Sequence, residues 1–148
     1  MPDKERFRAY IAAYLVLIKD EQILLSKRFN TGYQDGNYSL VAGHLDGEEK
    51  AKQCIIREAL EEAGIILDSN DLEVVHVMHR FDPQREYFDI YLRAVKYSGE
   101  IKVMEPNKCD EIKWYKIDEL PKNMVPEVKF ALEKINDGAH YSEFGWEE

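Results

Sequence analysis

A stretch of helical period over residues 48–63 constrains this chain more than any other segment, because it carries acidic side chains where a helix tolerates them least. Its apolar residues recur at helical spacing, and Gly64 is well placed to end it. Glu58, Glu61 and Glu62 lie three and four residues apart in its last turns. The backbone dipole disfavours anions there, and like charges four residues apart repel, each effect by a few tenths to about 1 kcal/mol. Stability alone would not choose this arrangement.

These carboxylates have two interpretations. They form either a solvated acidic face or a site for a hard divalent cation such as magnesium, which takes oxygen ligands and converts the repulsion into coordination. On a helical wheel, Glu62 lies beside Ala51 and Ile55 at the edge of the apolar face, so the acids do not all point into bulk solvent. Both interpretations stay open from the helix alone.

Apolar runs rich in β-branched and aromatic residues flank this helix and predict strands. Strands are expected at residues 10–18 and 23–29, which together predict a hairpin, and at 38–41, 72–81, 86–95 and 111–117. A second helix is expected at residues 126–135, with Pro126 at a favourable first position. Strands around two helices predict an α/β fold, and 148 residues without a long linker predict one domain, residues 1–148.

The charge balance argues against one large class of proteins. The chain has 20 basic and 29 acidic residues, and this formal net charge of −9 disfavours a protein that coats nucleic acid. An anionic substrate would need local Lys and Arg side chains or bound cations. Cys54 and Cys109 have no metal-ligand or redox spacing, and no apolar run approaches the roughly 20 residues that span a bilayer. We expect a soluble, cytoplasmic protein without a membrane segment.

A glycine upstream of the helix completes a longer pattern. Gly43 ends a predicted strand, and a glycine there lets a backbone group come close to a ligand. The pattern has seven fixed positions, which are Gly43, Glu49, Arg57, Glu58, Glu61, Glu62 and Gly64. A chance match is on the order of 10⁻⁸ per starting position. The pattern resembles the signature box of the Nudix hydrolases, and the flanking strands resemble that family's fold, a mixed β-sheet sandwiched between α-helices.

The resemblance implies a chemistry and a role for the matching residues. Nudix hydrolases cleave a diphosphate linkage in a nucleoside diphosphate joined to another group, and they use magnesium or manganese. By this likeness Glu58 and Glu62 are metal ligands, with Glu61 a third, and Gly43 offers its carbonyl oxygen. Glu58 is the first choice, and Glu61 the second, for the catalytic base that takes a proton from the attacking water.

The same likeness assigns supporting roles. Arg57 joins the catalytic set through an ion pair with Glu49, which holds the helix against the preceding loop. Glu105 resembles the extra carboxylate that many members bring to the metal from a later loop, and Glu111 is its competitor.

The segment before the box departs from the family pattern. Many members have Trp or Tyr followed by Leu-Pro-Gly-Gly, whereas residues 38–43 are Tyr-Ser-Leu-Val-Ala-Gly, so we expect a different loop for placing the substrate. Tyr38 is either a base-stacking residue of the substrate site or a core aromatic residue. Lys27 and Arg28, at the end of the second predicted strand, either bind substrate phosphates or are ordinary exposed residues.

The predicted function is magnesium-dependent hydrolysis of a small nucleotide, with manganese as the alternative metal. A softer likeness to oxidised-purine triphosphatases favours cleavage of a (d)NTP to a nucleoside monophosphate and pyrophosphate. The alternatives are hydrolysis of ADP-ribose, sugar nucleotides or dinucleoside polyphosphates, and a non-catalytic nucleotide sensor. Neither a nucleic acid polymer nor a membrane is an expected partner. Residues 141–146 carry three aromatic side chains, which pack either on the domain or against a second subunit of a homodimer.

Overall fold

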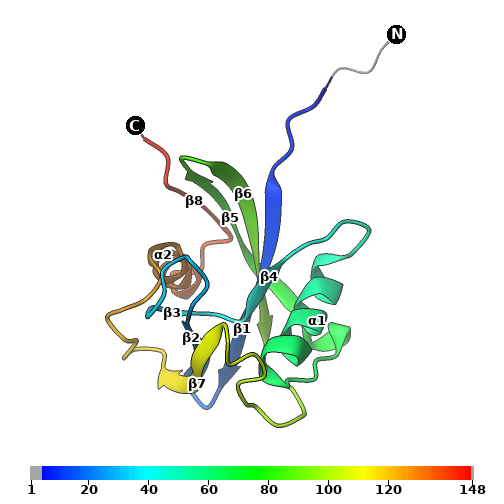
Figure 1. The fold of residues 1–148 in the computed structure, drawn as a ribbon, viewed down its shortest axis with the longest axis vertical. Helices are drawn as coiled ribbons and strands as arrows, with labels where there is room; N and C mark the ends of the chain where they lie inside the picture. The colour runs from blue at the N-terminus through cyan, green and yellow to red at the C-terminus, as the bar shows by residue number, and fades with distance from the viewer. Residues whose placement is uncertain (1–4, 148) are drawn as a thin grey trace.

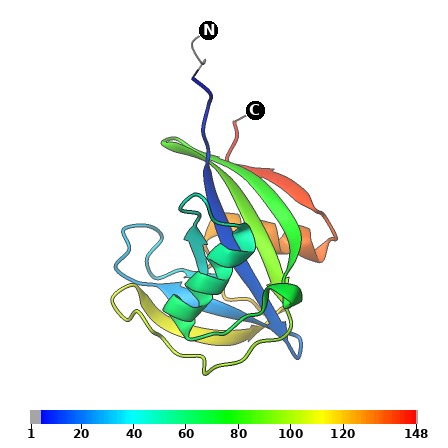
Figure 2. The same cartoon turned by 90° about the vertical axis from the view of Figure 1, so that its right-hand side faces the viewer.

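The computed structural model describes residues 5–147, in which two helices cover opposite faces of a mixed β-sheet (Figure 1). Figure 2 shows α1 in front of the strands and α2 behind them, which confirms the predicted α/β class. Within these residues no helix combines the length and apolar character needed to cross a lipid bilayer. The elements in chain order are β1 (Tyr10–Lys19), β2 (Gln22–Arg28), β3 (Tyr38–Ser39), β4 (Ala42–His44), α1 (Ala51–Ala63), a 3₁₀ turn (Ser69–Asp71), β5 (Glu73–Asp82), β6 (Arg85–Ala94), β7 (Cys109–Lys116), α2 (Pro126–Asn136) and β8 (Tyr141–Phe144).

The sheet divides at β1. Along one edge β1 pairs in parallel with β6 over most of its length. Its other edge is shared, because β4 pairs with residues 12–14 and β2 pairs only with Ile18 and Lys19. β2 then continues beside β7 and β3, which gives the strand order β3-β2-β1-β6-β5-β8. The predicted hairpin is present at its turn, but its two strands separate into different parts of the sheet.

Both faces of β1 are buried, which explains its nearly continuous apolar sequence. Side chains at positions 12, 14 and 16 belong to the core under α2, together with Met78, Tyr91 and Val128. Side chains at positions 13, 15 and 17 belong to the core under α1, together with Ile55 and Ala59. The alternation of a strand therefore assigns one strand to two cores.

α1 ends where the sequence predicts but begins later. Gly64 has a φ of 69°, and its N–H donates to the carbonyl oxygen of Leu60, so it caps the helix. The predicted start at Glu48 is wrong, since the helix begins at Ala51. The reason is the backbone of Gly47 and Glu48, whose φ values of 89° and 52° do not fit a right-handed helix.

Two strand predictions also need correction. The strand expected at residues 38–41 is shorter, since β3 covers only Tyr38–Ser39 and the next strand, β4, begins at Ala42. Between β3 and β4 the chain changes its pairing partner from β2 to β1. β8 was not predicted, and it forms from the aromatic tail by parallel pairing with β5. The buried ring of His76 ties it down, with Nδ1 2.9 Å from the Ala139 carbonyl oxygen and Nε2 2.7 Å from Ser142 Oγ. The tail thus packs on its own chain.

Gly64→Ala should destabilise the protein more than Gly138→Ala. Both glycines have a positive φ, 69° and 81°, where a side chain costs about 1 kcal/mol. At Gly64 a Cβ would also lie 2.7 Å from the Glu100 carbonyl oxygen, whereas nothing lies within 4 Å at Gly138. In urea unfolding we expect losses of about 1 kcal/mol for Gly138→Ala and about 2 kcal/mol or more for Gly64→Ala. Equal losses would contradict a role for the contact with Glu100.

Candidate active site

A cleft of about 790 Å³ is lined by residues of β1, β2, β4, α1 and α2. It brings together six residues predicted for the site, namely Lys27, Arg28, Gly43, Glu58, Glu62 and Glu105. Four other predicted residues are not among the described residues that line it, namely Tyr38, Glu49, Arg57 and Glu61. The six come from four segments of the chain, which are β2, β4, α1 and the loop before β7.

Gly43 and Glu58 pack so closely that a side chain on Gly43 would not fit. A Cβ there would collide with Cδ and Cγ of Glu58 and would lie 2.7 Å from its Oε1. The Cys54 thiol lies beneath this contact, with Sγ 3.7 Å and 3.5 Å from the carbonyl oxygens of Gly43 and His44. Burial raises the pKa of Cys54 to about 12, so the thiol stays protonated and donates. Glycine at this position therefore lets a backbone carbonyl and a carboxylate lie side by side.

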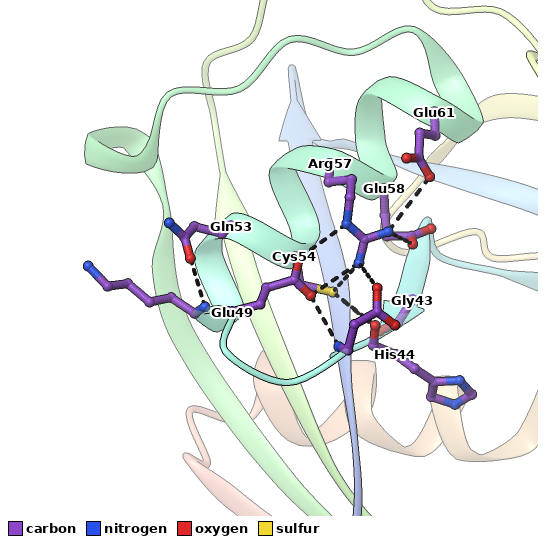
Figure 3. Close-up of polar contacts among 10 residues, drawn as sticks. Gly43, His44, Glu49, Gln53, Cys54, Arg57, Glu58 and Glu61 are labelled. Atoms are coloured by element: carbon purple, nitrogen blue, oxygen red, sulfur yellow. Dashed lines mark hydrogen bonds and ion pairs between the residues drawn. The ribbon is translucent and has the colours of Figure 1, made fainter.

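Arg57 organises the loop before α1 and one oxygen of Glu58 (Figure 3). Its Nε and Nη2 donate to the two oxygens of Glu49, both at 3.1 Å, which is the ion pair expected from the sequence. Its Nη1 donates to Glu58 Oε1 at 2.6 Å and lies 3.7 Å from Glu61 Oε2. Asp46 is also within 3.3 Å. Hydrogen bonds and charge from Glu49 above all, and from Glu58, raise the pKa of Arg57, so the guanidinium keeps its charge.

Glu62 carries a carboxyl group whose charge is poorly compensated. Its Oε2 is buried and has no hydrogen-bond partner among residues 5–147. Burial, and to a smaller extent the neighbouring carboxyl groups of Glu58 and Glu105, raise the pKa of Glu62 to about 10. Without a cation nearby, this carboxyl group holds its proton at neutral pH. The repulsion between carboxylates that the sequence predicts therefore acts most strongly on Glu62, which avoids it by staying protonated.

The donor atoms on the α1 side of the cleft suit a hard divalent cation. Glu58, Glu62 and Glu105 offer carboxylate oxygens and Gly43 a carbonyl, which are ligands that magnesium and manganese accept. A cation would also supply the positive charge that Glu62 Oε2 lacks. In the described part of the chain no group of three or more His, Cys, Asp or Glu side chains is already arranged to hold a metal, and Glu58 is turned toward Arg57.

Two basic side chains at the end of β2 line the same cleft. Arg28 donates from Nε to the Tyr33 carbonyl oxygen at 2.7 Å and from Nη2 to Thr31 Oγ1 at 3.1 Å, so it also holds the loop that follows β2. Lys27 Nζ lies 3.9 Å from an Asp110 carboxylate oxygen. Together they place positive charge in the cleft that contains the carboxylates, where an anionic substrate group would need it.

Tyr38, an alternative substrate-site residue, and Glu111, the alternative to Glu105 as the extra metal carboxylate, contact each other away from the cleft lining. Tyr38 is 7% exposed, and its hydroxyl donates to Glu111 Oε1 at 2.7 Å. Its ring packs edge-on against Tyr115 in the core. This position favours the core interpretation of Tyr38 over the substrate-binding one. Glu105 lines the cleft whereas Glu111 is not among the described lining residues, which favours Glu105 as the carboxylate from the later loop.

Sequence reasoning missed a buried polar cluster on the α2 side of the cleft. Arg80 and Glu127 are buried and line the cleft, and Arg80 donates to both oxygens of the buried Asp89 at 2.6 and 3.2 Å. The alternation of side chains along β5 and β6 could have revealed this cluster. Arg80 and Asp89 occupy positions on the same strand faces as the core residues Met78 and Tyr91. A charged residue at such a position is rarely buried without a partner.

The family model described as the NUDIX domain matches residues 9–134. This match covers most of the chain, so the chain belongs to the NUDIX family. It confirms the family and the enzyme class, Nudix hydrolase, that the signature box predicts.

Individual relatives agree with this membership. The NAD-capped RNA hydrolase NudC of Escherichia coli (strain SMS-3-5 / SECEC) is 29% identical over 120 residues, which are 80% of this chain and 44% of the relative. The chain thus spans less than half the length of the curated relatives it matches. The MutT NUDIX hydrolase from Burkholderia pseudomallei has 26% identity and a TM-score of 0.79, over 86% of this chain and 98% of that chain. The MutT protein from Bacillus halodurans, at 19% identity and a TM-score of 0.71 over 91% and 89% of the two chains, shares the fold.

The raised pKa of Glu62 leads us to expect that metal-free stability falls as pH rises. Between the usual pKa of 4.5 and the folded-state pKa of about 10, the folded chain binds more protons than the unfolded chain. The contribution of Glu62 to the free energy of unfolding is fully present below about pH 4.5. It is lost as the pH rises toward 10, by up to roughly 1.4 kcal/mol per pH unit. Urea unfolding is measured with a chelator at about pH 6 and about pH 9. The free energy of unfolding should fall less between these two pH values for Glu62→Gln than for the unaltered chain.

Glu61→Gln is the matched control for this measurement. Glu61 is the preceding residue of the same helix, but its side chain is 52% exposed. We expect this variant to keep the pH-dependent loss of the unaltered chain. If Glu62→Gln keeps it as well, the buried proton does not reside on Glu62.

Proposed function

We propose that this chain hydrolyses a diphosphate linkage in a nucleoside diphosphate derivative, with Mg²⁺ as cofactor and Mn²⁺ as the alternative. The observation that carries the proposal is the convergence of Glu58, Glu62 and Glu105 on one cleft that also contains two basic side chains. Carboxylates that suit a divalent cation, placed beside cations that suit phosphate, match what a diphosphate substrate requires. Membership of the NUDIX family supports the same chemistry.

Different residues have different proposed roles in this reaction. Glu58, Glu62, Glu105 and the Gly43 carbonyl would hold a divalent cation, which would neutralise charge on the phosphoryl oxygens and make a bound water more acidic. Glu58 is the proposed base, because it lines the cleft and Arg57 binds only its Oε1, which leaves the other oxygen to take a proton from water. Glu61 remains the second choice, although it is 52% exposed and is not among the described residues that line the cleft. Lys27 and Arg28 would bind phosphate oxygens of the substrate.

Within this substrate class we favour a nucleoside triphosphate, cut to a monophosphate and pyrophosphate, with oxidised purines as one form. The support is the resemblance of the sequence to the triphosphatase branch of the family. The cleft volume of about 790 Å³ also lies within the range of about 300–1,000 Å³ that is usual for small-molecule sites.

The NudC relatives favour a second candidate. Their name describes hydrolysis of NAD-capped RNA, and the NAD unit contains a diphosphate between two nucleosides. The formal net charge of −9 disfavours binding of a long RNA through its phosphates. The form of this candidate that suits the chain is therefore a free dinucleotide or ADP-ribose rather than a polymer.

A product analysis separates these candidates. Nucleoside triphosphates, NAD, ADP-ribose and sugar nucleotides are incubated with the protein and with Mg²⁺ or Mn²⁺, and the products are resolved by chromatography. Pyrophosphate release from a triphosphate supports the first candidate, and two monophosphates from NAD support the second. Inertness toward every diphosphate-containing compound with both metals would overturn the proposal.

We also propose that the protein is cytoplasmic and that it forms a homodimer. Cys54 and Cys109 are free thiols, which suits a reducing compartment. The aromatic tail still exposes Tyr141 and Trp146, 49% and 41%, although β8 pairs within its own chain.

Glu58→Gln should lower turnover by about 10²–10⁴-fold while the protein stays folded, because the amide cannot accept the proton of the attacking water. Glu61→Gln is the comparison variant, and its loss should be smaller because Glu61 is more exposed. Initial rates on the best substrate and circular dichroism provide the two measurements. Turnover of Glu58→Gln close to that of the unaltered chain would exclude Glu58 as the base.

Magnesium at millimolar concentration should raise the melting temperature of the unaltered chain by about 2–5 °C, because a ligand that binds the folded state stabilises it. Glu62→Gln should lose most of this shift, because the neutral amide of Gln cannot provide the buried carboxylate oxygen as a ligand. Calcium-free buffers and scanning fluorimetry suffice for the comparison. An equal shift in both proteins would place the cation elsewhere.

A further inference from the structure

Arg85 is a basic residue of the cleft that has no role in the proposed hydrolysis. It lies at the start of β6, directly after the turn from β5, and it lines the cleft. The neighbouring Arg80 pairs with three carboxylates, whereas Arg85 forms no ion pair with a carboxylate among residues 5–147. The chain has 29 acidic residues, so this lack of a partner is not due to a shortage of acids. An unpaired guanidinium in the wall of a cleft has the chemistry to bind an anionic ligand.

Two tyrosines hold the Arg85 side chain in place. Its guanidinium carbon lies 4.9 Å from the centre of the Tyr10 ring, and its Nη1 donates a weak hydrogen bond of 3.4 Å to the Tyr87 hydroxyl. The Asp82 carboxylate in the same turn accepts the backbone N–H groups of Gln84 and Arg85 instead. The other guanidinium N–H groups of Arg85 donate to no acceptor among residues 5–147. A guanidinium that stacks on a ring presents these free donors in a fixed plane.

Arg85 lies on the opposite side of β1 from the basic residues of the proposed function. β2, which ends at Arg28, and β6, which begins at Arg85, are the two neighbours of β1 in the strand order. Arg28 is bound to the loop after β2 through the Tyr33 carbonyl oxygen and Thr31 Oγ1, whereas Tyr10 on β1 holds Arg85. These contacts keep the two guanidinium groups apart, so a phosphate at Arg85 is distinct from one at Arg28.

A row of side chains connects Arg85 with the proposed metal site. Tyr87, which accepts the hydrogen bond from Arg85, stacks on the His44 ring with ring centres 5.7 Å apart. His44 directly follows Gly43, whose carbonyl is a proposed metal ligand. All four residues line the same cleft. A substrate whose diphosphate lies at the metal site can therefore extend past His44 and Tyr87 to Arg85.

We propose that Arg85 binds a phosphate group of the substrate that lies beyond the hydrolysed linkage. This inference rests on the proposed function, because it requires a nucleotide whose diphosphate lies at Glu58 and Glu62. Such a phosphate is either an ester on a ribose or the end of a longer phosphate chain, and both present terminal oxygens to the guanidinium. Tyr10 is a positioning residue, since it acts through Arg85.

The test compares nucleotides that differ by one phosphate group. NADP⁺ with NAD⁺ tests a phosphate on the ribose, and ATP with ADP tests the end of the chain. In at least one pair, kcat/KM for hydrolysis with Mg²⁺ should favour the member with the added phosphate by about tenfold or more, because the other member lacks a charge-assisted hydrogen bond. The selective pair identifies the source of the phosphate. Equal values in both pairs, or preference for the smaller member, would overturn the proposal.

Arg85→Gln tests the residue itself. Arg85 is exposed, so this variant should fold. A neutral amide cannot pair with a charged phosphate, so the ratio within the selective pair should fall by about tenfold, toward one. Arg93→Gln is the matched control and should keep the ratio, because Arg93 is exposed on the same strand and is not among the described residues that line the cleft. Arg85→Lys, which keeps the charge, should restore part of the ratio. If Arg85→Gln lowers kcat/KM equally for both members, the ratio is unchanged and the proposal is overturned.

Binding without metal separates this inference from the proposed function. Calorimetry with a chelator compares adenosine 2′,5′-bisphosphate with AMP for the ribose phosphate, and ATP with ADP for the end of the chain. At least one pair should show the preference in Kd, and Arg85→Gln should lose it. If the chain hydrolyses no nucleotide but keeps this preference, the proposed function fails and the phosphate site stands. If hydrolysis occurs with equal kcat/KM in both pairs, the function stands and the phosphate site fails.

Discussion

The close contact between Gly43 and Glu58 is the constraint on which the site depends. Because residue 43 has no side chain, α1 can lie against β4 with the Glu58 carboxyl group in the space that a Cβ would fill. Arg57, the adjacent residue, binds Glu49 and so fastens the loop between the strand and the helix. Helix, loop and strand are thereby held in one arrangement, and the carboxyl groups of Glu58 and Glu62 line the cleft as a result.

The cleft places two electrostatic environments in one acidic protein. On the α1 side, a buried oxygen of Glu62 has no hydrogen-bond partner among residues 5–147, and a bound cation would supply a partner of opposite charge. On the α2 side, the carboxylate of Glu127 accepts a hydrogen bond from Tyr33 and lies 3.6 Å from Arg80 Nη1. In a chain with a net charge of −9, Lys27 and Arg28 place local positive charge beside the carboxylates of this cleft.

Sequence reasoning succeeded where the determinants are local. The helical period and Gly64 predict the end of α1, and apolar runs rich in β-branched and aromatic residues predict most strands, because both signals depend on neighbouring residues. It failed where partners are distant. The separation of β2 from β1 depends on pairing with β7, and β8 exists because β5 offers an unpaired edge. Arg80 and Glu127 come from different elements, and their alignment required the fold.

The sequence by itself determined the family, the α/β class and the identity of the acids on α1, because spacing along one helix is enough to place side chains on a common face. Only the tertiary structure decided that Glu105 joins this cleft, that Tyr38 lies in the core, and that Glu127 faces the same space. The physical reason is that burial and long-range pairing arise from the packing of elements far apart in the chain, which no local pattern records.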